Sequence, residues 1–390
     1  MNDAPLRRQY LRICFISNPN SIHTQRWVKW FSNRGHQVVL IGDTKLGQPW
    51  HSIPLFDLPA RINIPKLKYL AWIFWTRKII KRWQPDILHA HRVTGAGWIG
   101  SFTGFHPFVV TPWGTDLYQY PYRSRLGRWL THHVLNHADL ITAGSTNLLQ
   151  QACLFGAQPE KACLIHWGVN LNFFHPIGQT DQLRKKLGLG DEPVVLSFRA
   201  IHPIYKQDTI LEAISEALKM IPNIELVLIN FNPEPAYQKK LGAKIIELGL
   251  EDHVIWIKEA IPWEKMPEVY RLADVGISVP SSDSVPVSLL EAISCGLPVI
   301  ASNLPSIREW IIHGENGLLV PAGDPRALSE AILQLLHHPE QGEKFRQFNQ
   351  NLIHERANHE HEMIKMETLY EKLAMEKYGK DHEPCSNAPI

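Results

Sequence analysis

Two carboxylates in the second half of the chain, Asp283 and Glu291, stand on either side of a predicted helix start, with seven residues between them. The backbone N–H groups at the start of a helix are unpaired and lie at the positive end of the helix dipole, so they suit a phosphate. We expect these groups to come from Val287, Ser288 and Leu289. The pattern therefore predicts an anion site flanked by two acids.

The two acids would repel a bound phosphate, so they need a different role. A carboxylate accepts hydrogen bonds, and a sugar attached to the phosphate would offer several hydroxyl donors. A phosphate together with a polyol indicates a nucleotide sugar as the ligand. An acidic helix that is merely exposed to solvent is the competing interpretation.

Two cations could neutralise the diphosphate of such a ligand. Arg199 follows a strand predicted at 194–198, and Lys206 lies seven residues further along. A guanidinium and an ammonium that reach one point can hold a diphosphate and stabilise it as it leaves. An ordinary surface position is the alternative for Lys206.

Four residues of the first half are candidates for contact with a ligand. His23 follows the first predicted strand, His91 ends a strand predicted at 87–91, and Trp113 and Asp116 follow one predicted at 108–111. Ligands of α/β proteins bind at the C-terminal ends of the strands, where these residues would lie. A helix-cap role for His23 and a structural strand-end role for His91 are the alternatives.

The elements that must position these residues form two successive rounds of strand and helix. Strands are predicted at 12–17, 37–41, 87–91, 108–111, 140–143 and 162–165 in the first round. In the second they are predicted at 194–198, 225–229, 254–257, 298–301 and 317–320. Helical patterns between them predict an α/β protein with two Rossmann-like domains of parallel sheet that face a central cleft.

The domain boundaries follow from a loss of apolar periodicity between residues 176 and 192. We expect an N-terminal acceptor-side domain over residues 1–180 and a C-terminal nucleotide-sugar-binding domain over 181–340. The charged helical segment 341–390 should pack back on the body and end in a tail.

The composition is typical of a globular protein in a reducing compartment. The chain has 390 residues, of which 44% are hydrophobic and 20% charged. Its five cysteines are scattered and never form a CxxC pair, which argues against disulfides and a structural zinc site. The first residues lack the apolar core of a signal peptide, so we expect a cytoplasmic protein.

Basic residues are concentrated in one region, since eleven Lys or Arg stand against two acids between Arg61 and Arg128. This balance suits an anionic partner such as a membrane surface, a phosphorylated lipid or nucleic acid, and a solvated basic face is an equal alternative. Residues 66–83 form a basic, aromatic-rich amphipathic pattern that could lie on the inner face of the cell membrane, although core packing competes. Its apolar stretch, 69–75, is too short to span a bilayer.

The quoted segments resemble glycosyltransferase family 4, and the resemblance covers almost the whole chain. Residues 282–296 are similar to the branch in which the first acid is Asp, here Asp283, where most of the family has Glu. Glu291 matches the family's ribose-binding acid, and Arg199 and Lys206 match its diphosphate-binding pair, although the loop between them is longer here.

The resemblance implies the GT-B fold and a retaining hexosyltransferase. The enzyme would move a hexosyl unit from a nucleotide diphosphate sugar to a hydroxyl of a glycan, a lipid-linked or a small-molecule acceptor, with closure of the domains aligning the two. Asp283 would orient the sugar ring, and the acceptor side would be formed by His23, His91, Trp113 and Asp116. The chain has no Asp-x-Asp pair, which agrees with a reaction that uses no metal or other cofactor. We expect a role in polysaccharide or cell-envelope glycan synthesis and no nucleic-acid partner.

One position departs from the family, because Trp113 stands where an imidazole usually lies near the reacting carbon. Tryptophan takes up no proton at neutral pH, but the leaving phosphate itself is thought to deprotonate the acceptor in the retaining reaction. A catalytically silent nucleotide-sugar-binding or scaffold protein is the main alternative. An epimerase of related shape and an NAD enzyme that uses the GxGxxG of residues 95–100 are two others.

Overall fold

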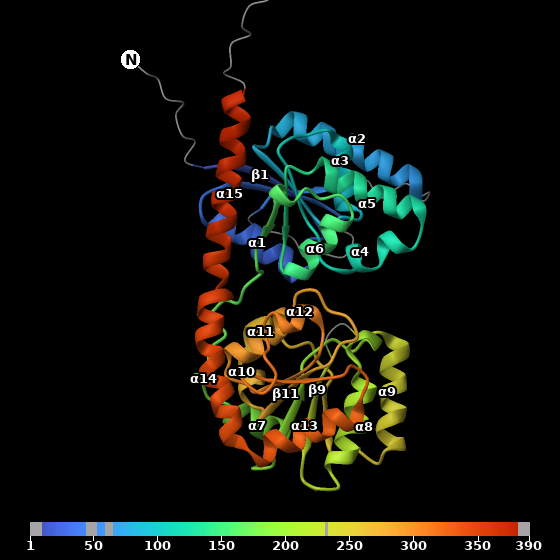
Figure 1. Cartoon of the computed structure of the whole chain (residues 1–390), viewed down its shortest axis with the longest axis vertical. Helices are drawn as coiled ribbons and strands as arrows, with labels where there is room; N and C mark the ends of the chain where they lie inside the picture. The colour runs from blue at the N-terminus through green and yellow to red at the C-terminus, as the bar shows by residue number, and fades with distance from the viewer. Residues whose placement is uncertain (1–9, 44–52, 59–64, 231–232, 381–390) are drawn as a thin grey trace, which may run out of the picture. The chain divides into compact units, whose positions relative to one another are not determined.

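The structure is a computed structural model that describes residues 10–43, 53–58, 65–230 and 233–380. It contains two parallel sheets with helices packed on them (Figure 1). Contacts divide the chain into unit 1, which runs to Ile165 and resumes at His361, and unit 2, which spans His166–Glu360. The predicted α/β class is confirmed.

The sheet of unit 1 has the strand order β3-β2-β1-β4-β5-β6-β7, and all neighbouring pairs are parallel. The strands are buried on both faces and consist of nearly continuous apolar runs, as parallel strands do. They are β1 (Arg12–Ile16), β2 (Gln37–Gly42), β3 (Leu55–Asp57), β4 (Ile87–His91), β5 (Phe108–Thr111), β6 (Leu140–Ala143) and β7 (Ala162–Leu164).

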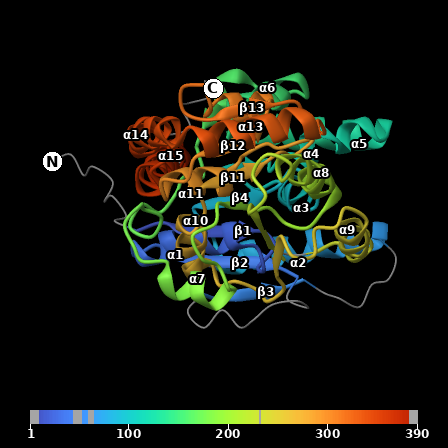
Figure 2. The same ribbon diagram turned by 90° about the horizontal axis from the view of Figure 1, so that it is seen from below.

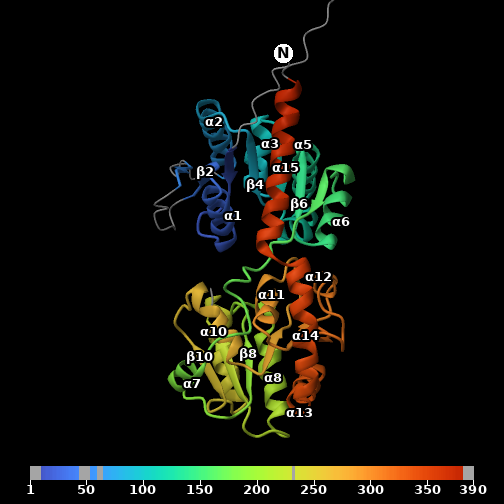
Figure 3. The same ribbon diagram turned by 90° about the vertical axis from the view of Figure 1, so that its left-hand side faces the viewer.

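Helices cover both faces of this sheet. Since side chains alternate along a strand, Cys14 faces a core shared with α2, α3, α5 and α6, whereas Phe15 faces Phe31 of α1 at 6.0 Å between ring centres. Phe31 also contacts Tyr370 of α15 at 5.0 Å, and Figure 3 shows α15 passing in front of β4. The helices are α1 (Ile22–Asn33), α2 (Pro65–Trp83), α3 (Ala96–Thr103), α4 (Thr115–Tyr118), α5 (Arg125–His137), α6 (Thr146–Leu154) and α15 (His359–Lys380), with 3₁₀ turns at Tyr120–Tyr122 and Pro159–Lys161.

Unit 2 repeats this architecture with the strand order β10-β9-β8-β11-β12-β13, again all parallel; Figure 2 shows β11, β12 and β13 side by side. The strands are β8 (Val194–Ser197), β9 (Glu225–Ile229), β10 (Val254–Ile257), β11 (Val275–Ser278), β12 (Val299–Ser302) and β13 (Leu318–Val320). The helices are α7 (Asp181–Leu187), α8 (Gln207–Ala217), α9 (Pro235–Glu247), α10 (Met266–Arg271), α11 (Val287–Ser294), α12 (Pro305–Arg308), α13 (Pro325–His337) and α14 (Pro339–Arg356), with 3₁₀ turns at Pro203–Tyr205 and Trp263–Lys265.

The units differ in extent from the domains expected at 1–180, 181–340 and 341–390. Residues from His166 onward belong to unit 2 because Val169 and Phe174 are buried in its core. Helix α14 also belongs to unit 2, where Phe345 and Ile353 are buried. The chain returns to unit 1 within α15, and Glu367 there pairs with Arg34 and His36.

The basic amphipathic pattern at 66–83 lies in helix α2. Its Trp72, Ile79 and Ile80 are buried in the core of unit 1, whereas Leu70 and Phe74 are exposed. Among the helices that the structure describes, none is both long and apolar enough to cross a membrane.

Candidate functional site

In unit 2 the ends of β8 and β11 lie side by side, because these strands are neighbours in the sheet. Arg199 follows β8, and the loop after β11 carries Asp283. Their side chains form an ion pair, with Nη2 of Arg199 2.9 Å from Oδ2 of Asp283, and both are less than one-tenth exposed (9% and 8%). The structure therefore joins two predicted site residues that are 84 positions apart in the sequence.

The guanidinium of Arg199 has further partners around it. Its Nη1 donates to Oγ of Ser278 at 3.4 Å, and the ring of Tyr205 lies 4.4 Å from its central carbon. Burial alone would lower the pKa of Arg199, but Asp283 and Tyr205 outweigh it and hold that pKa above its ordinary value. Arg199 is thus a fixed, permanent cation.

Backbone contacts hold the Asp283 loop in place. Oδ1 of Asp283 accepts from the N–H of Ser284 at 2.8 Å, and its carbonyl oxygen accepts from Oγ of Ser306 at 2.8 Å. Its Oδ2 is buried and, apart from the ion pair with Arg199, makes no well-aligned hydrogen bond in the described part of the chain.

Glu291, the second acid, is buried among aromatic side chains. Its Oε1 accepts from Nε1 of Trp263 at 3.2 Å. Tyr270 lies beside it: burial, and after it the charge and the hydrogen bond of Glu291, raises the pKa of the Tyr270 hydroxyl well above its usual value. The aromatic side chains thus fix the carboxylate of Glu291, which lies midway along α11.

The start of α11 offers two backbone donors. The N–H of Val287 donates to the carbonyl of Val285 at 2.9 Å, so it is occupied. The N–H groups of Ser288 and Leu289 have no hydrogen bond among the described residues, as expected for the first turn of a helix without a capping side chain. Of the three N–H groups predicted at 287–289 for an anion, those of Ser288 and Leu289 are therefore open in the described chain.

Lys206 stands immediately before α8 in the left-handed region, at φ 56°. Its loop is fixed by Gln207, whose Nε2 donates to the carbonyl of Ala200 at 2.6 Å. No ion pair of Lys206 is found among the residues that the structure describes. The side chain that contacts Arg199 is instead that of Tyr205, one position earlier.

Tyr205 and Trp263 are the site residues that sequence reasoning missed. Tyr205 adjoins the predicted Lys206, so a search for aromatic neighbours of the two cations would have found it. Trp263 lies 28 residues before Glu291 in a short 3₁₀ turn, and its sequence carries no comparable signal.

In unit 1 three predicted residues gather at the ends of β4 and β5. The ring of Trp113 lies 5.8 Å from His91 and 5.9 Å from His23, and His91 also contacts Trp27 at 5.2 Å. His91 is 3% exposed, and neither of its ring nitrogens has a hydrogen-bond partner among the described residues. The cluster consists of imidazole and indole rings.

Both imidazoles of this cluster are neutral at physiological pH. Burial lowers the pKa of His91 to about 3. Burial, Arg26 and His91 together lower the pKa of His23 to about 3. These rings can donate or accept a hydrogen bond, but they are weak proton acceptors.

The carboxylate of Asp116 is fully occupied by backbone N–H groups, so its role is structural. Its Oδ1 accepts from the N–H groups of Trp113 and Gly114 at 2.9 and 2.8 Å, and its Oδ2 accepts from that of Val93 at 2.7 Å. Burial raises the pKa of Asp116 while these N–H groups oppose the rise. Asp116 thus clamps the Trp113 loop to the segment after β4.

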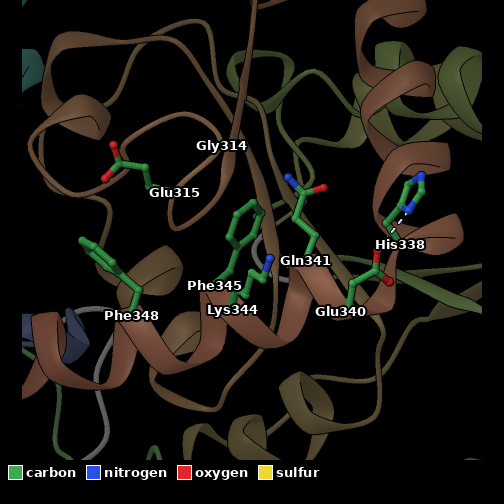
Figure 4. A pocket seen from close by; sticks show the side chains of 8 residues that line it. All are labelled: Gly314, Glu315, His338, Glu340, Gln341, Lys344, Phe345 and Phe348. Atoms are coloured by element: carbon green, nitrogen blue, oxygen red, sulfur yellow. Dashed lines mark hydrogen bonds and ion pairs between the residues drawn. The ribbon is translucent and has the colours of Figure 1, made fainter.

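Two other features lie apart from these clusters. Two glycines of the GxGxxG at 95–100 serve packing, since a Cβ on Gly97 would come within 3.0 Å of Val134 and one on Gly100 closer still to the ring of Phe108. A cavity of about 540 Å³ in unit 2 lies between the Gly314 loop and the start of α14 (Figure 4). It is lined by none of the predicted site residues but by Gly314, Glu315, His338, Glu340, Gln341, Lys344, Phe345 and Phe348.

The chain matches two family descriptions that together cover most of its length. Residues 179–352 match "Glycosyl transferases group 1", and residues 12–146 match "Glycosyl transferase 4-like". The first match lies in unit 2 and includes Arg199, Asp283 and Glu291, and the second lies in unit 1.

Named relatives and solved structures agree with these matches. A D-inositol 3-phosphate glycosyltransferase of Thermobispora bispora is 25% identical over 78% of this chain and 74% of that protein. A GDP-mannose-dependent mannosyltransferase of Mycolicibacterium smegmatis that acts on phosphatidylinositol monomannoside is 28% identical over 55% of this chain and 57% of its own.

Solved structures with a similar fold include two that align with almost the whole chain. The structure of Anabaena Alr3699/HepE in complex with UDP and glucose aligns with a TM-score of 0.79 over 93% of this chain and all of that one, at 18% identity. Sucrose-phosphate synthase from Thermosynechococcus elongatus aligns with the same TM-score at 21% identity, over 93% of this chain and 98% of that one. The chain has the GT-B fold and belongs to glycosyltransferase family 4, the group 1 glycosyltransferases.

Proposed function

We propose that this glycosyltransferase is a retaining hexosyltransferase that transfers a hexosyl unit from a nucleotide diphosphate sugar to a hydroxyl acceptor. The observation that carries the proposal is the buried Arg199 beside Asp283 in unit 2. A permanently charged guanidinium in a site of low polarity is suited to a diphosphate both when it binds and when it leaves.

The other donor contacts follow from the same unit. The free N–H groups of Ser288 and Leu289 would hold a phosphate oxygen, Glu291 would accept from the ribose hydroxyls, and Lys206 would add a second cation. Solved structures with UDP-glucose and a relative named as GDP-mannose-dependent support a nucleotide sugar but leave the base open for this chain.

Unit 1 would contribute the acceptor contacts through His23, His91 and Trp113. Both ring nitrogens of His91 are without a partner among the described residues, and in the neutral ring one of them can accept a hydrogen bond from an acceptor hydroxyl while the other donates. We propose that the departing phosphate takes the proton of this hydroxyl, because Trp113 has no basic atom and a pKa near 3 makes His91 a weak base.

A donor screen tests the proposal. Purified protein is incubated with UDP-, GDP- and ADP-hexoses, and release of nucleoside diphosphate and transfer to added acceptors are measured. We expect one donor to be hydrolysed slowly and transferred with retention of the anomeric configuration. No turnover of any donor on long incubation would contradict the enzyme, and inverted product would contradict the retaining reaction.

A catalytically silent nucleotide-sugar-binding protein is the second candidate, and Trp113 in the usual imidazole position is the observation that favours it. Calorimetry separates the two. Binding of a nucleotide sugar without any product would support the silent protein, whereas product formation would eliminate it.

We further propose that unit 1 contacts an anionic membrane at the cytoplasmic face. Arg77 of α2 donates to the carbonyl of Phe102 at 2.7 Å, and the ring of Phe102 lies 6.3 Å from that of Trp129 on α5. Phe74 and Trp129 are exposed beside exposed basic residues of α2 and α5. The acids between residues 65 and 137, Asp86 and Asp116, are both buried. Such a surface suits anionic headgroups.

Vesicle sedimentation tests this contact. The protein should pellet with vesicles that contain phosphatidylglycerol and stay in solution with pure phosphatidylcholine. The double variant Phe74→Ser and Trp129→Ser should lose most binding, whereas the equally exposed pair Met220→Ser and Ile246→Ser in unit 2 serves as the control. Equal sedimentation of both variants would exclude this surface.

A further inference from the structure

The ion pair of Arg199 and Asp283 affects how a nucleotide sugar can bind, because it occupies N–H groups of Arg199 that the diphosphate would need. Nη2 of Arg199 faces Asp283 at 2.9 Å, Nη1 donates to Ser278, and Tyr205 covers the guanidinium. A diphosphate bound by two parallel N–H groups requires one free edge of the guanidinium. The diphosphate and Asp283 therefore compete for the same N–H groups of Arg199.

Asp283 is also incompletely satisfied. Its Oδ1 already accepts from Ser284, whereas its buried Oδ2 relies on the charge of Arg199 and has no well-aligned hydrogen bond in the described chain. A buried carboxylate that loses its counter-ion is costly unless another donor replaces it. A hexose hydroxyl would be such a donor, and a nucleoside diphosphate without sugar offers none at this position.

We propose that Asp283 and the donor's diphosphate exchange places on Arg199. Without ligand, Asp283 neutralises Arg199; when the donor binds, the diphosphate takes the guanidinium, and the freed Oδ2 accepts from a hydroxyl of the hexose. The exchange makes tight binding of the diphosphate depend on the sugar. After transfer the nucleoside diphosphate has no hexose, so Asp283 pairs with Arg199 again and promotes release of the product.

This inference rests on the proposed donor site and predicts an unusual effect of Asp283→Asn. The amide keeps the size of the side chain but does not compete as an anion for Arg199. If the paired state is about ten times more populated than the open one, the variant should bind nucleoside diphosphate about tenfold more tightly than the wild type. Its preference for the nucleotide sugar over the nucleoside diphosphate should fall toward one.

Calorimetry with UDP, GDP and ADP, and with the matching hexose donors, measures both quantities. Glu367→Gln is the matched control, because it removes a similarly buried carboxylate from an arginine pair in unit 1. It should leave nucleotide affinity unchanged. Unchanged or weaker binding of the nucleoside diphosphate by Asp283→Asn would overturn the exchange and leave Asp283 as a simple anchor of Arg199.

A measurement on the unaltered protein covers the case in which Asp283→Asn does not fold. In a crystal structure with bound nucleotide sugar, Arg199 should have left Asp283 for the phosphates, and Oδ2 of Asp283 should accept from a hexose hydroxyl; a pair still within hydrogen-bond distance would overturn the proposal. Wild-type protein that binds none of the three diphosphates would instead contradict the donor site itself, so the two failures are distinguishable.

Discussion

The candidate residues of the two units differ in charge. In unit 2, Arg199 and Asp283 carry full charges in a buried pair, and Glu291 is fixed by hydrogen bonds from aromatic residues. In unit 1, His23, His91 and Trp113 form a cluster that carries no charge at neutral pH. Both clusters lie where parallel strands end, so the shared architecture provides the place and the side chains decide the chemistry.

This difference corresponds to the two substrates that we propose. A diphosphate needs permanent positive charge, and buried charge is tolerated in unit 2 because each charged group has a partner. A hydroxyl acceptor is neutral, and an uncharged imidazole with open nitrogens can bind it at little cost in desolvation. The comparison can be tested by removing the charge of Arg199 from unit 2 or by protonating the imidazoles of unit 1.

Arg199→Ala should have the largest effect. Loss of the guanidinium removes a charged contact that strengthens as the diphosphate leaves, so kcat/KM for transfer should fall by at least about 100-fold. Steady-state kinetics with the donor identified in the screen measure it.

Arg326→Ala is the control for this variant, since Arg326 is an exposed arginine of the same unit paired with Glu330. It should retain the wild-type rate. A wild-type rate in Arg199→Ala would show that the buried guanidinium of unit 2 takes no part in catalysis.

Acid should weaken unit 1 through two imidazoles whose pKa is lowered in the folded chain. The pKa of both His23 and His91 is about 3 in the folded chain against an ordinary value of 6.5. Between these values the unfolded chain binds protons that the folded chain does not. Stability therefore falls as pH drops below 6.5, by up to about 1.4 kcal/mol per pH unit for each group. The urea midpoint of unfolding at pH 7.5 and pH 5 measures this loss.

His91→Phe should remove the contribution of one imidazole while preserving a ring in the aromatic cluster. The drop in midpoint between pH 7.5 and pH 5 should be smaller than in the wild type. His338→Phe, which alters an exposed histidine of unit 2, should leave the drop unchanged. An identical drop in His91→Phe and the wild type would contradict a neutral, buried His91.

Much of the fold could be predicted, and the residues of the candidate donor site could be selected, because local sequence pattern encodes both. Apolar runs between helical periods indicated parallel sheets, and the helix start with its two acids indicated an anion site. Two short strands, Leu55–Asp57 and Val275–Ser278, were not predicted from the pattern. Short apolar runs give too little periodicity to separate strand from loop.

The contact of Arg199 with Asp283 could not be predicted because it depends on strand order. The sequence pattern does not say that β8 lies beside β11, and this neighbour relation brings the two loops together. The contact of Trp263 with Glu291 likewise joins a 3₁₀ turn to a helix through tertiary packing. Long-range contacts of this kind follow from topology, so pattern reasoning found the residues but not their partners.

Trp263→Phe should have the smallest effect and would sharpen the comparison within unit 2. Phenylalanine keeps a ring near Phe173 and Phe174 but removes the N–H that donates to Glu291. A hydrogen bond to a charged group contributes about 1.5–3 kcal/mol at most. Because Tyr270 still contacts the carboxylate of Glu291, we expect only a small part of this loss, with nucleoside diphosphate binding about threefold more weakly. Calorimetry with the nucleotide and with pyrophosphate measures it.

The two probes separate binding of the ribose from binding of the phosphates. If Glu291 binds the ribose, Trp263→Phe weakens the nucleotide and leaves pyrophosphate unchanged, because pyrophosphate has no ribose. Trp256→Phe, which alters a tryptophan on β10, controls for a general loss of indole packing. Equal weakening of both probes would mean that Trp263 supports the phosphate site as a whole, and the separate assignment of Glu291 to the ribose would be wrong.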